Sequence, residues 1–141
     1  MASRTPVRPA LVICCKDYRY IQPIQRFVKQ RLGIQWYNLK ATAGGSRALL
    51  DSPSVVQKWI LRDIELVYRL HGVRRVVIIH HADCAAYGGS AKLGKPAQER
   101  RFHRAQVKRT GRLLRKNFAG LKVSGFLASG YPAAIRVTPL N

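Results

Sequence analysis

The stretch VRRVVIIHHADCAAYGGS, residues 73–90, joins an apolar run to a loop of histidine, aspartate, cysteine and glycine. β-Branched residues dominate positions 73–79, and such a run is typical of a strand buried on both faces in a parallel sheet. The loop at 80–90 begins at the carboxyl end of that strand, where open α/β sheets bind their ligands. The stretch therefore predicts a buried central strand with a functional site beside it.

A second stretch of this kind, ALVICCKDYR, covers residues 10–19 and predicts another buried strand at 10–15. Helical and strand-like patterns alternate along the rest of the chain, whereas the tail at 129–141 has too little pattern to assign. The patterns predict further strands at 34–39 and 121–128 and helices at 20–32, from Asp51 or Ser52 to Gly72, and at 96–118. The spacing in the helix before Gly72 predicts a buried stripe of Val55, Val56, Trp59, Ile60, Ile64, Val67 and Tyr68.

The alternation of strands and helices indicates an α/β fold with a central, mostly parallel sheet of about four strands flanked by helices. We expect the common strand order 2-1-3-4, in which a crevice opens between the carboxyl ends of the first and third strands. A chain of 141 residues suits one domain. We assign residues 10–141 to this domain and residues 1–9 to a basic N-terminal arm.

Three metal-ligating residue types follow the first and third predicted strands. Cys15 ends the first strand, while His81 and Cys84 follow the third. Two thiolates and one imidazole are a good ligand set for Zn²⁺, and such a site leaves a fourth position for water. A fourth protein ligand, Asp17 or His103, would instead make the site structural. His80 competes for the histidine position, and the spacing favours His81.

Two side chains beside Cys15 form a candidate ion pair. Asp17 and Arg19 share a face if the chain stays extended there, which allows a bidentate contact. The alternative is an ordinary surface salt bridge, worth about 0–1 kcal/mol. Cys14 is expected to be a buried apolar residue, because neighbours in a strand face opposite ways. Asp83 is either a turn residue or a support for the metal site.

The pattern C-x-D-x-R from Cys15, followed some 66 residues later by H-x-x-C from His81, resembles the β-class carbonic anhydrases, in particular their short single-domain members. The fragments ICCKDYR, ATAGG and VVIIHHADCAAYGG occur in the order of that family and span about residues 11–89. The resemblance implies a central parallel sheet and a dimer as the basic unit. It departs from the family at Ala82 and Ala85, where threonine and glycine are usual.

The same resemblance implies the roles of the site residues. Zinc would be held by Cys15, His81 and Cys84, with Asp17 and Arg19 as the catalytic dyad. In the resembled family this aspartate can also take the fourth metal position and close the site. Gly44 and Gly45 would let the backbone approach the cavity that binds carbon dioxide or bicarbonate.

We therefore expect a zinc-dependent carbonic anhydrase that interconverts carbon dioxide and bicarbonate through a zinc-bound hydroxide. A hydrolase of carbonyl sulfide or carbon disulfide would use the same chemistry on a similar linear molecule. A third possibility is a non-catalytic, zinc-stabilised module whose basic face binds nucleic acid or the ribosome.

The charge of the chain is unusual, because 26 Lys and Arg face 6 Asp and Glu, for a net charge of +20. Within the predicted helix at 96–118, one stripe of cations recurs at spacings of three and four: Arg101, Arg104, Lys108, Arg112 and Arg115. Nucleic acid would suit this stripe, and a solvated basic face is the plainer alternative. The field could also concentrate small anions such as bicarbonate near the site.

Apolar segments and cysteines bear on the expected location. No apolar stretch approaches the roughly 18 residues that a membrane span needs, so we expect no membrane association. Residues 1–9 do not have the pattern of a secretory signal. The odd set of three cysteines suits a reducing compartment, which predicts a cytoplasmic protein.

Overall fold

The predicted buried strands lie at the centre of a five-stranded sheet, described here by a computed structural model for residues 7–140. The strand order is β2-β1-β3-β4-β5, in which the first four strands are parallel and β5 is antiparallel to β4. The strands are β1 (Ala10–Cys14), β2 (Tyr37–Ala41), β3 (Arg75–His81), β4 (Lys122–Ser129) and β5 (Arg136–Pro139). The α/β class and the order 2-1-3-4 are thus confirmed.

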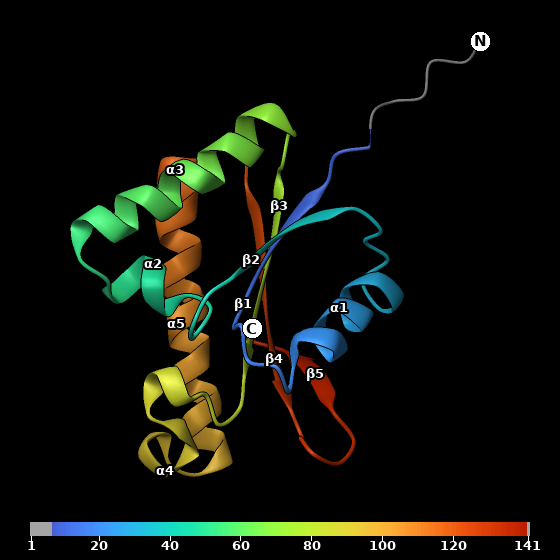
Figure 1. Cartoon of the computed structure of the whole chain (residues 1–141), viewed down its shortest axis with the longest axis vertical. Helices are drawn as coiled ribbons and strands as arrows, with labels where there is room; N and C mark the ends of the chain where they lie inside the picture. Colours follow the sequence, from blue (N-terminus) through green and yellow to red (C-terminus); the bar gives the residue numbers. More distant parts are fainter. Residues whose placement is uncertain (1–6, 141) are drawn as a thin grey trace.

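Helices cover both faces of the sheet (Figure 1). One face carries α1 (Ile21–Gln30), and the other carries α3 (Ser54–Leu70) and α5 (Pro96–Asn117). The remaining elements are the short helices α2 (Arg47–Asp51) and α4 (Gly89–Leu93) and the 3₁₀ turn η1 (Ala85–Tyr87). None of the helices within residues 7–140 is both long and apolar enough to cross a membrane.

Alternation along β1 divides the core into two layers. Leu11 and Ile13 pack in the cluster with α3 and α5, whereas Val12 and Cys14 pack in the cluster with α1. Successive strand residues point to opposite faces, so a strand with both faces covered must be apolar throughout. Cys14 is accordingly buried on the α1 side, as predicted.

The structure corrects several element boundaries. The second strand is displaced toward the C-terminus by about three residues relative to the prediction of 34–39, and α2 was not predicted. The unassigned tail supplies β5, a four-residue edge strand that returns antiparallel to β4 after Gly130, whose φ is +107°. A short edge strand carries too few residues for a clear period-two pattern, which explains why it was missed. Residues 1–6 of the proposed arm lie outside the described residues.

The predicted buried stripe of α3 is wrong in its N-terminal half. Ile60 and Ile64 are buried, but Val55, Val56 and Trp59 are 72%, 38% and 64% exposed. Figure 1 shows that this end of α3 extends away from the sheet and lies beside the short helix α2. The stripe was apolar in sequence, yet burial depends on what lies opposite it.

Candidate metal centre

The candidate metal centre lies where β1 and β3 run side by side and end at the same edge of the sheet. Cys14 of β1 is in register with Ile79 of β3, so the residues that follow both strands meet in space. Cys15 follows β1, His81 is the last residue of β3, and Cys84 lies in the loop beyond it. Because β1 pairs with β2 on one side and β3 on the other, this edge is the predicted crevice.

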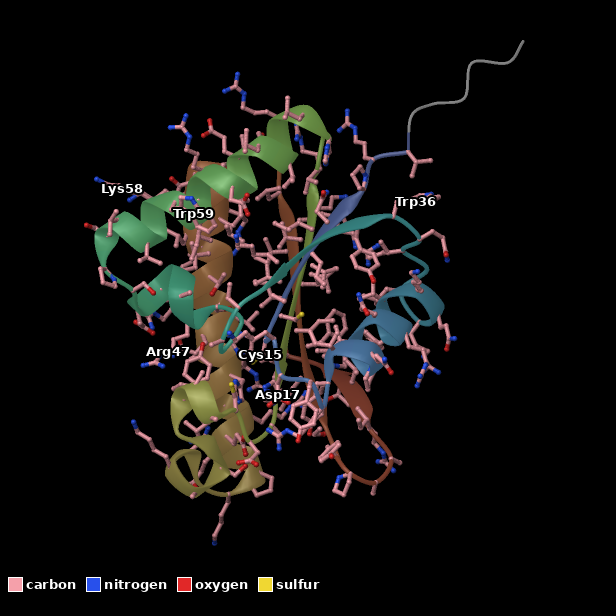
Figure 2. All side chains as sticks on the ribbon, viewed as in Figure 1. Cys15, Asp17, Trp36, Arg47, Lys58 and Trp59 are labelled. Carbon is pink, nitrogen blue, oxygen red and sulfur yellow. The ribbon has the colours of Figure 1, made fainter. Side chains whose placement is uncertain are left out.

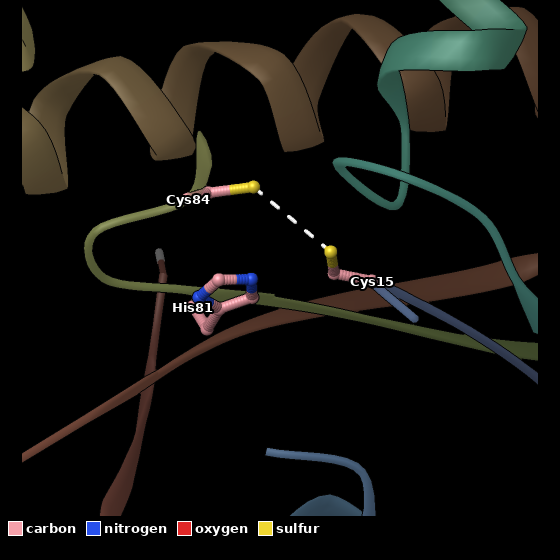
Figure 3. Close-up of side chains that lie close together, drawn as sticks. All are labelled: Cys15, His81 and Cys84. Atoms are coloured by element: carbon pink, nitrogen blue, oxygen red, sulfur yellow. Dashed lines mark hydrogen bonds between the residues drawn. The ribbon is translucent and has the colours of Figure 1, made fainter. Parts of the chain in front are cut away.

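Three side chains from these two loops converge on one space (Figure 3). One ligand atom from each of Cys15, His81 and Cys84 lies within 4.8 Å of the other two, and all three residues are buried. The Sγ atoms of the two cysteines are 4.0 Å apart. Two thiolates on a tetrahedral Zn²⁺, each at about 2.3 Å, would be about 3.8 Å apart. The spacing of the donors therefore fits a zinc ion.

The imidazole of His81 is oriented for a ligand. Its Nδ1 lies 2.8 Å from the backbone oxygen of Ala82, so Nδ1 donates and Nε2 keeps its lone pair. That Nε2 is buried and has no hydrogen-bond partner among the described residues. Tyr20 stacks on the ring with centroids 4.7 Å apart and holds its plane. A buried nitrogen without a partner is costly, and a metal ion would satisfy it.

The thiols differ strongly in acidity. Hydrogen bonding from the Cys84 thiol, helped by the backbone N–H of Gly44 at 3.3 Å, lowers the pKa of Cys15 to about 4. The same shared proton, together with burial, raises the pKa of Cys84. Burial also raises the pKa of Cys14 to about 12, on the far side of the sheet. Cys15 is therefore the thiol of this pair that ionises first, and Cys84 carries the proton that the two sulfurs share.

Asp17 faces the same space and is held by Arg19. The Arg19 Nε and Nη2 donate three hydrogen bonds to the two carboxylate oxygens of Asp17 at 2.8–3.2 Å, and the backbone N–H of Arg19 adds a fourth at 2.9 Å. These bonds from Arg19 lower the pKa of Asp17. Asp17 Oδ2 lies 3.7 Å from Nε2 of His81. The pair is thus a partly buried bidentate contact beside the metal centre.

A buried acid supports this pair from behind. Glu99 of α5 is 5% exposed and accepts hydrogen bonds from the backbone N–H of Asp83 at 2.6 Å and from the Ser90 hydroxyl at 2.8 Å. Asp83 in turn accepts hydrogen bonds from Arg19, at 3.0 Å on its backbone oxygen and at 3.4 Å on its carboxylate. Asp83 has φ of 57°, so it is both a turn residue and a support for the dyad.

The two other candidate histidines form a separate buried pair. His80 and His103 are joined through their Nδ1 atoms at 3.0 Å, and the Ser46 hydroxyl lies 2.8 Å from His80 Nε2. His103 Nε2 is 3.9 Å from Glu99. Neither histidine belongs to the group that could hold a metal. His80 and His103 therefore fasten β3 to α5 and are not part of the donor set.

The double glycine lies against the centre. Gly44 has φ of +76°, and a Cβ there would come within 2.9 Å of Arg47 Cβ. Gly45 has φ of +66°, and a Cβ would come within 3.3 Å of the His80 ring. Both positions therefore need glycine, and this is what brings the Gly44 amide to Cys15.

Sequence patterns did not indicate Tyr20, Ser46 or Glu99 as parts of this region. Each lies far along the chain from its partner and has no local motif. The available signal for Glu99 was its isolation, since it is the single acid among eleven cations between residues 92 and 122. A lone acid in such a segment is a candidate for a buried partner.

Comparison with known proteins places these features in a family. The family model described as "Putative carbonic anhydrase" matches residues 6–134. The uncharacterized protein RC0076 of Rickettsia conorii is 30% identical over 122 residues, which are 83% of this chain and 65% of that protein. This chain thus spans slightly less than two thirds of that relative. An uncharacterized protein of Rickettsia bellii is 26% identical over 122 residues, 83% of this chain and 74% of that protein.

Solved structures with the same fold are β-carbonic anhydrases. Isoform I of Trichomonas vaginalis matches with a TM-score of 0.60 at 16% identity, over 98% of this chain and 86% of that chain. CafA of Aspergillus fumigatus matches with a TM-score of 0.50 at 19% identity, over 95% and 77%. The sheet order and the three-residue donor group define an α/β protein with a candidate metal site at its crevice. The chain belongs to the carbonic anhydrase family, and its fold is that of the β-class.

Proposed function

We propose that this protein is a zinc-dependent carbonic anhydrase that interconverts carbon dioxide and bicarbonate, with Cys15, His81 and Cys84 as the zinc ligands. The observation that carries the proposal is the position of Asp17, 3.7 Å from the unpartnered Nε2 of His81 but held on both oxygens by Arg19. A carboxylate held in this way lies beside the donor group without belonging to it. The arrangement supports three protein ligands and an open fourth position, as catalytic zinc sites require.

Zinc, when bound, lowers the pKa of a coordinated water toward neutrality and so supplies a nucleophile for carbon dioxide. The chain supplies the Asp17 carboxylate as a hydrogen-bond acceptor for that water. Arg19 keeps Asp17 ionised and fixes its orientation. Two thiolates make the water less acidic than three imidazoles would, so a positioned acceptor is more useful here. Asp83 and Glu99 keep Arg19 in place and are positioning residues.

The backbone at Gly44 and Gly45 is the proposed wall of the substrate cavity. Its N–H at Gly44 is committed to Cys15, so this wall presents no free donor at that atom. Tyr87 donates to the Gly44 carbonyl at 3.1 Å and holds the turn in place. These two hydrogen bonds fix the conformation of the turn beside the Cys15 sulfur.

Stopped-flow measurement of carbon dioxide hydration on zinc-loaded protein tests the proposal. We expect zinc near one per chain and a turnover that Asp17→Ala abolishes while zinc is retained. Zinc without turnover would instead favour the non-catalytic zinc module. Hydrolysis of carbonyl sulfide or carbon disulfide in place of carbon dioxide hydration would assign the same site to the related hydrolase.

We also propose that the chain forms a homodimer through the outer face of α3, defined by Val55, Trp59, Leu66 and Leu70. These residues lie at helical spacing and are 51–74% exposed. Lys40 of the edge strand β2 lies 4.5 Å from the Trp59 ring centroid, so the face continues onto the open sheet edge. Figure 2 shows Trp59 in the N-terminal half of α3, next to Lys58. Exposed apolar faces of this kind mark interaction sites.

Light scattering at micromolar concentration tests the dimer. We expect a dimer mass for the native chain and a monomer mass for Trp59→Glu. The matched control is Lys29→Glu, an exposed position on α1 across the sheet, which should leave the dimer intact. A native monomer, or a Trp59→Glu dimer, would refute this interface.

A reducing location, the cytoplasm, is proposed from the cysteines. Cys14, Cys15 and Cys84 are all free thiols. Since Cys15 and Cys84 lie only 4.0 Å apart, oxidation would join two of the three proposed ligands. Detection of the protein in fractionated cells, with thiol labelling of both cysteines after zinc removal, tests this location.

A further inference from the structure

We propose that the outer side of α5 is a nucleic-acid binding surface that contacts the phosphates of a duplex. The surface, named here the α5 stripe, consists of Arg101, Arg104, Lys108, Arg112 and Arg115. The inner side of the same helix is buried, through Glu99, His103, Gln106, Val107, Thr110, Gly111 and Leu114. The proposal concerns an activity separate from the metal centre, and it stands or fails independently of it.

The positive charge of the α5 stripe is not compensated by the acidic residues of the chain. The chain has only six acids, and each is already engaged elsewhere in the structure. The engaged pairs are Asp17 and Asp83 with Arg19, Asp51 with Arg109, Asp63 with Lys40, Glu65 with Arg69, and Glu99 with His103. Within residues 7–140, no cation of the stripe has an acidic partner. The stripe must therefore be neutralised by counterions or by an anionic partner.

The stripe is straight and preformed. With a rise of about 1.5 Å and a rotation of about 100° per residue, Arg101 to Arg115 spans about 21 Å along the axis, and the five side chains fall within an arc of about 80°. Like charges at these spacings repel one another, so the helix keeps them aligned only because its other side is anchored in the core. Leu114 and Val107 of that side are 0% and 6% exposed.

A duplex matches this geometry. Double-stranded nucleic acid presents about one phosphate per 1.7 Å of axis, so a 21 Å rigid line of cations meets a rigid line of anions of higher density. Release of counterions from the phosphates then drives binding. Because the stripe contains no aromatic side chain for base stacking, recognition is expected to be independent of base sequence.

A membrane surface fits less well. An interfacial helix needs large apolar residues beside its cations. Ala105 lies between the cations on this side, and none of the exposed large hydrophobic residues of the described chain lies on α5. The α5 stripe is therefore suited to a polyanion that stays outside the protein.

Fluorescence anisotropy with labelled 20-base-pair duplex RNA and duplex DNA of random sequence tests the surface. We expect binding at 50 mM salt, with an affinity that is about 500-fold weaker at 200 mM salt. This is the fall expected for five phosphate contacts. The variant Arg101→Gln/Lys108→Gln/Arg112→Gln should bind at least tenfold more weakly at 100 mM salt. For this variant, the slope of log affinity against log salt concentration should be shallower by about 2.7, which is about 0.9 for each lost phosphate contact.

A charge-matched control separates the stripe from net charge. Arg26→Gln/Lys29→Gln/Arg31→Gln removes three exposed cations from α1 and its C-cap, on the opposite side of the sheet, and should change affinity by less than threefold. Circular dichroism and zinc content confirm that both variants are folded. Equal losses in the two variants, or no binding of the native chain at 50 mM salt, would overturn the proposal. Stripe-dependent binding to phosphatidylserine vesicles without duplex binding would also overturn it and assign the surface to membranes.

Discussion

Glu99 accepts a 2.6 Å hydrogen bond from the backbone N–H of Asp83, which joins a buried residue of α5 to the loop beside the metal centre. The backbone oxygen of Asp83 in turn accepts a hydrogen bond from Arg19, and Arg19 donates to the carboxylate of Asp17. The orientation of the proposed proton acceptor, Asp17, thus depends on a carboxylate three hydrogen-bonded steps away. Groups of this kind tune metal sites as strongly as many ligands do.

Glu99→Ala is expected to lower carbon dioxide hydration by about tenfold or more while zinc content stays near one per chain. The loss also leaves the Asp83 N–H without its acceptor, at a cost of about 1–3 kcal/mol in unfolding free energy. Glu99→Gln keeps an acceptor oxygen and should restore most of the activity. Stopped-flow rates and urea unfolding measure the two effects. The control Glu65→Ala, at an exposed i,i+4 pair, should change neither, and equal losses in both variants would disprove a positioning role.

Asp17→Asn removes the charge of the acceptor and keeps its shape. We expect a fall in turnover of about 100-fold or more, because proton handling contributes at that scale. Zinc stoichiometry by atomic absorption should not change, since Asp17 lies outside the three-residue donor group. Loss of zinc in Asp17→Asn would show that the aspartate is a fourth ligand, which would make the site closed.

Cys84→Ala and Cys14→Ala form a matched pair on opposite sides of the sheet. Cys84→Ala should lose zinc to well below 0.5 per chain, because a two-ligand site binds weakly. Cys14→Ala should retain zinc, since Cys14 is packed against the α1 layer and burial keeps its thiol protonated. Retained zinc in Cys84→Ala, or its loss in a folded Cys14→Ala, would refute the ligand assignment.

The buried pair of His80 and His103 predicts a loss of stability in acid. Burial lowers the pKa of His103 to about 4, against 6.5 in the unfolded chain, and lowers that of His80 to about 3. Between pH 6.5 and 4 the unfolded chain therefore binds more protons than the folded chain, so the unfolding free energy falls as the pH falls. For His103 alone the loss is on the order of 3 kcal/mol.

Urea unfolding of the metal-free protein at pH 7.5, 6.0 and 5.0 measures this loss. His103→Gln should reduce the pH dependence, because one of the two buried histidines is gone. His71→Gln, at the exposed C-cap of α3, should leave it unchanged. A native chain that is equally stable at pH 7.5 and 5.0 would contradict the prediction.

The order of elements and the candidate donor group were predictable because their signals are local. Continuous apolar runs at 10–15 and 76–79 identified the two central strands, and the residues that end parallel neighbours meet at one edge of a sheet. The burial of the N-terminal half of α3 was mispredicted. Helical spacing of apolar residues shows which face a helix can bury, but it does not show whether another element packs against that face. The edge strand β5 was missed because four residues carry little periodicity.

The sequence by itself determined the α/β architecture and the placement of Cys15, His81 and Cys84 after two buried strands, whereas the order 2-1-3-4 was expected only because it is the common one. Only the tertiary structure decided that Tyr20 stacks on His81, that His103 bonds to His80, and that Glu99 is buried behind the dyad. The physical reason is the separation along the chain between the residues that interact. Strand formation depends on neighbours along the chain, whereas the burial of a polar residue depends on partners that helix packing brings from elsewhere in the sequence.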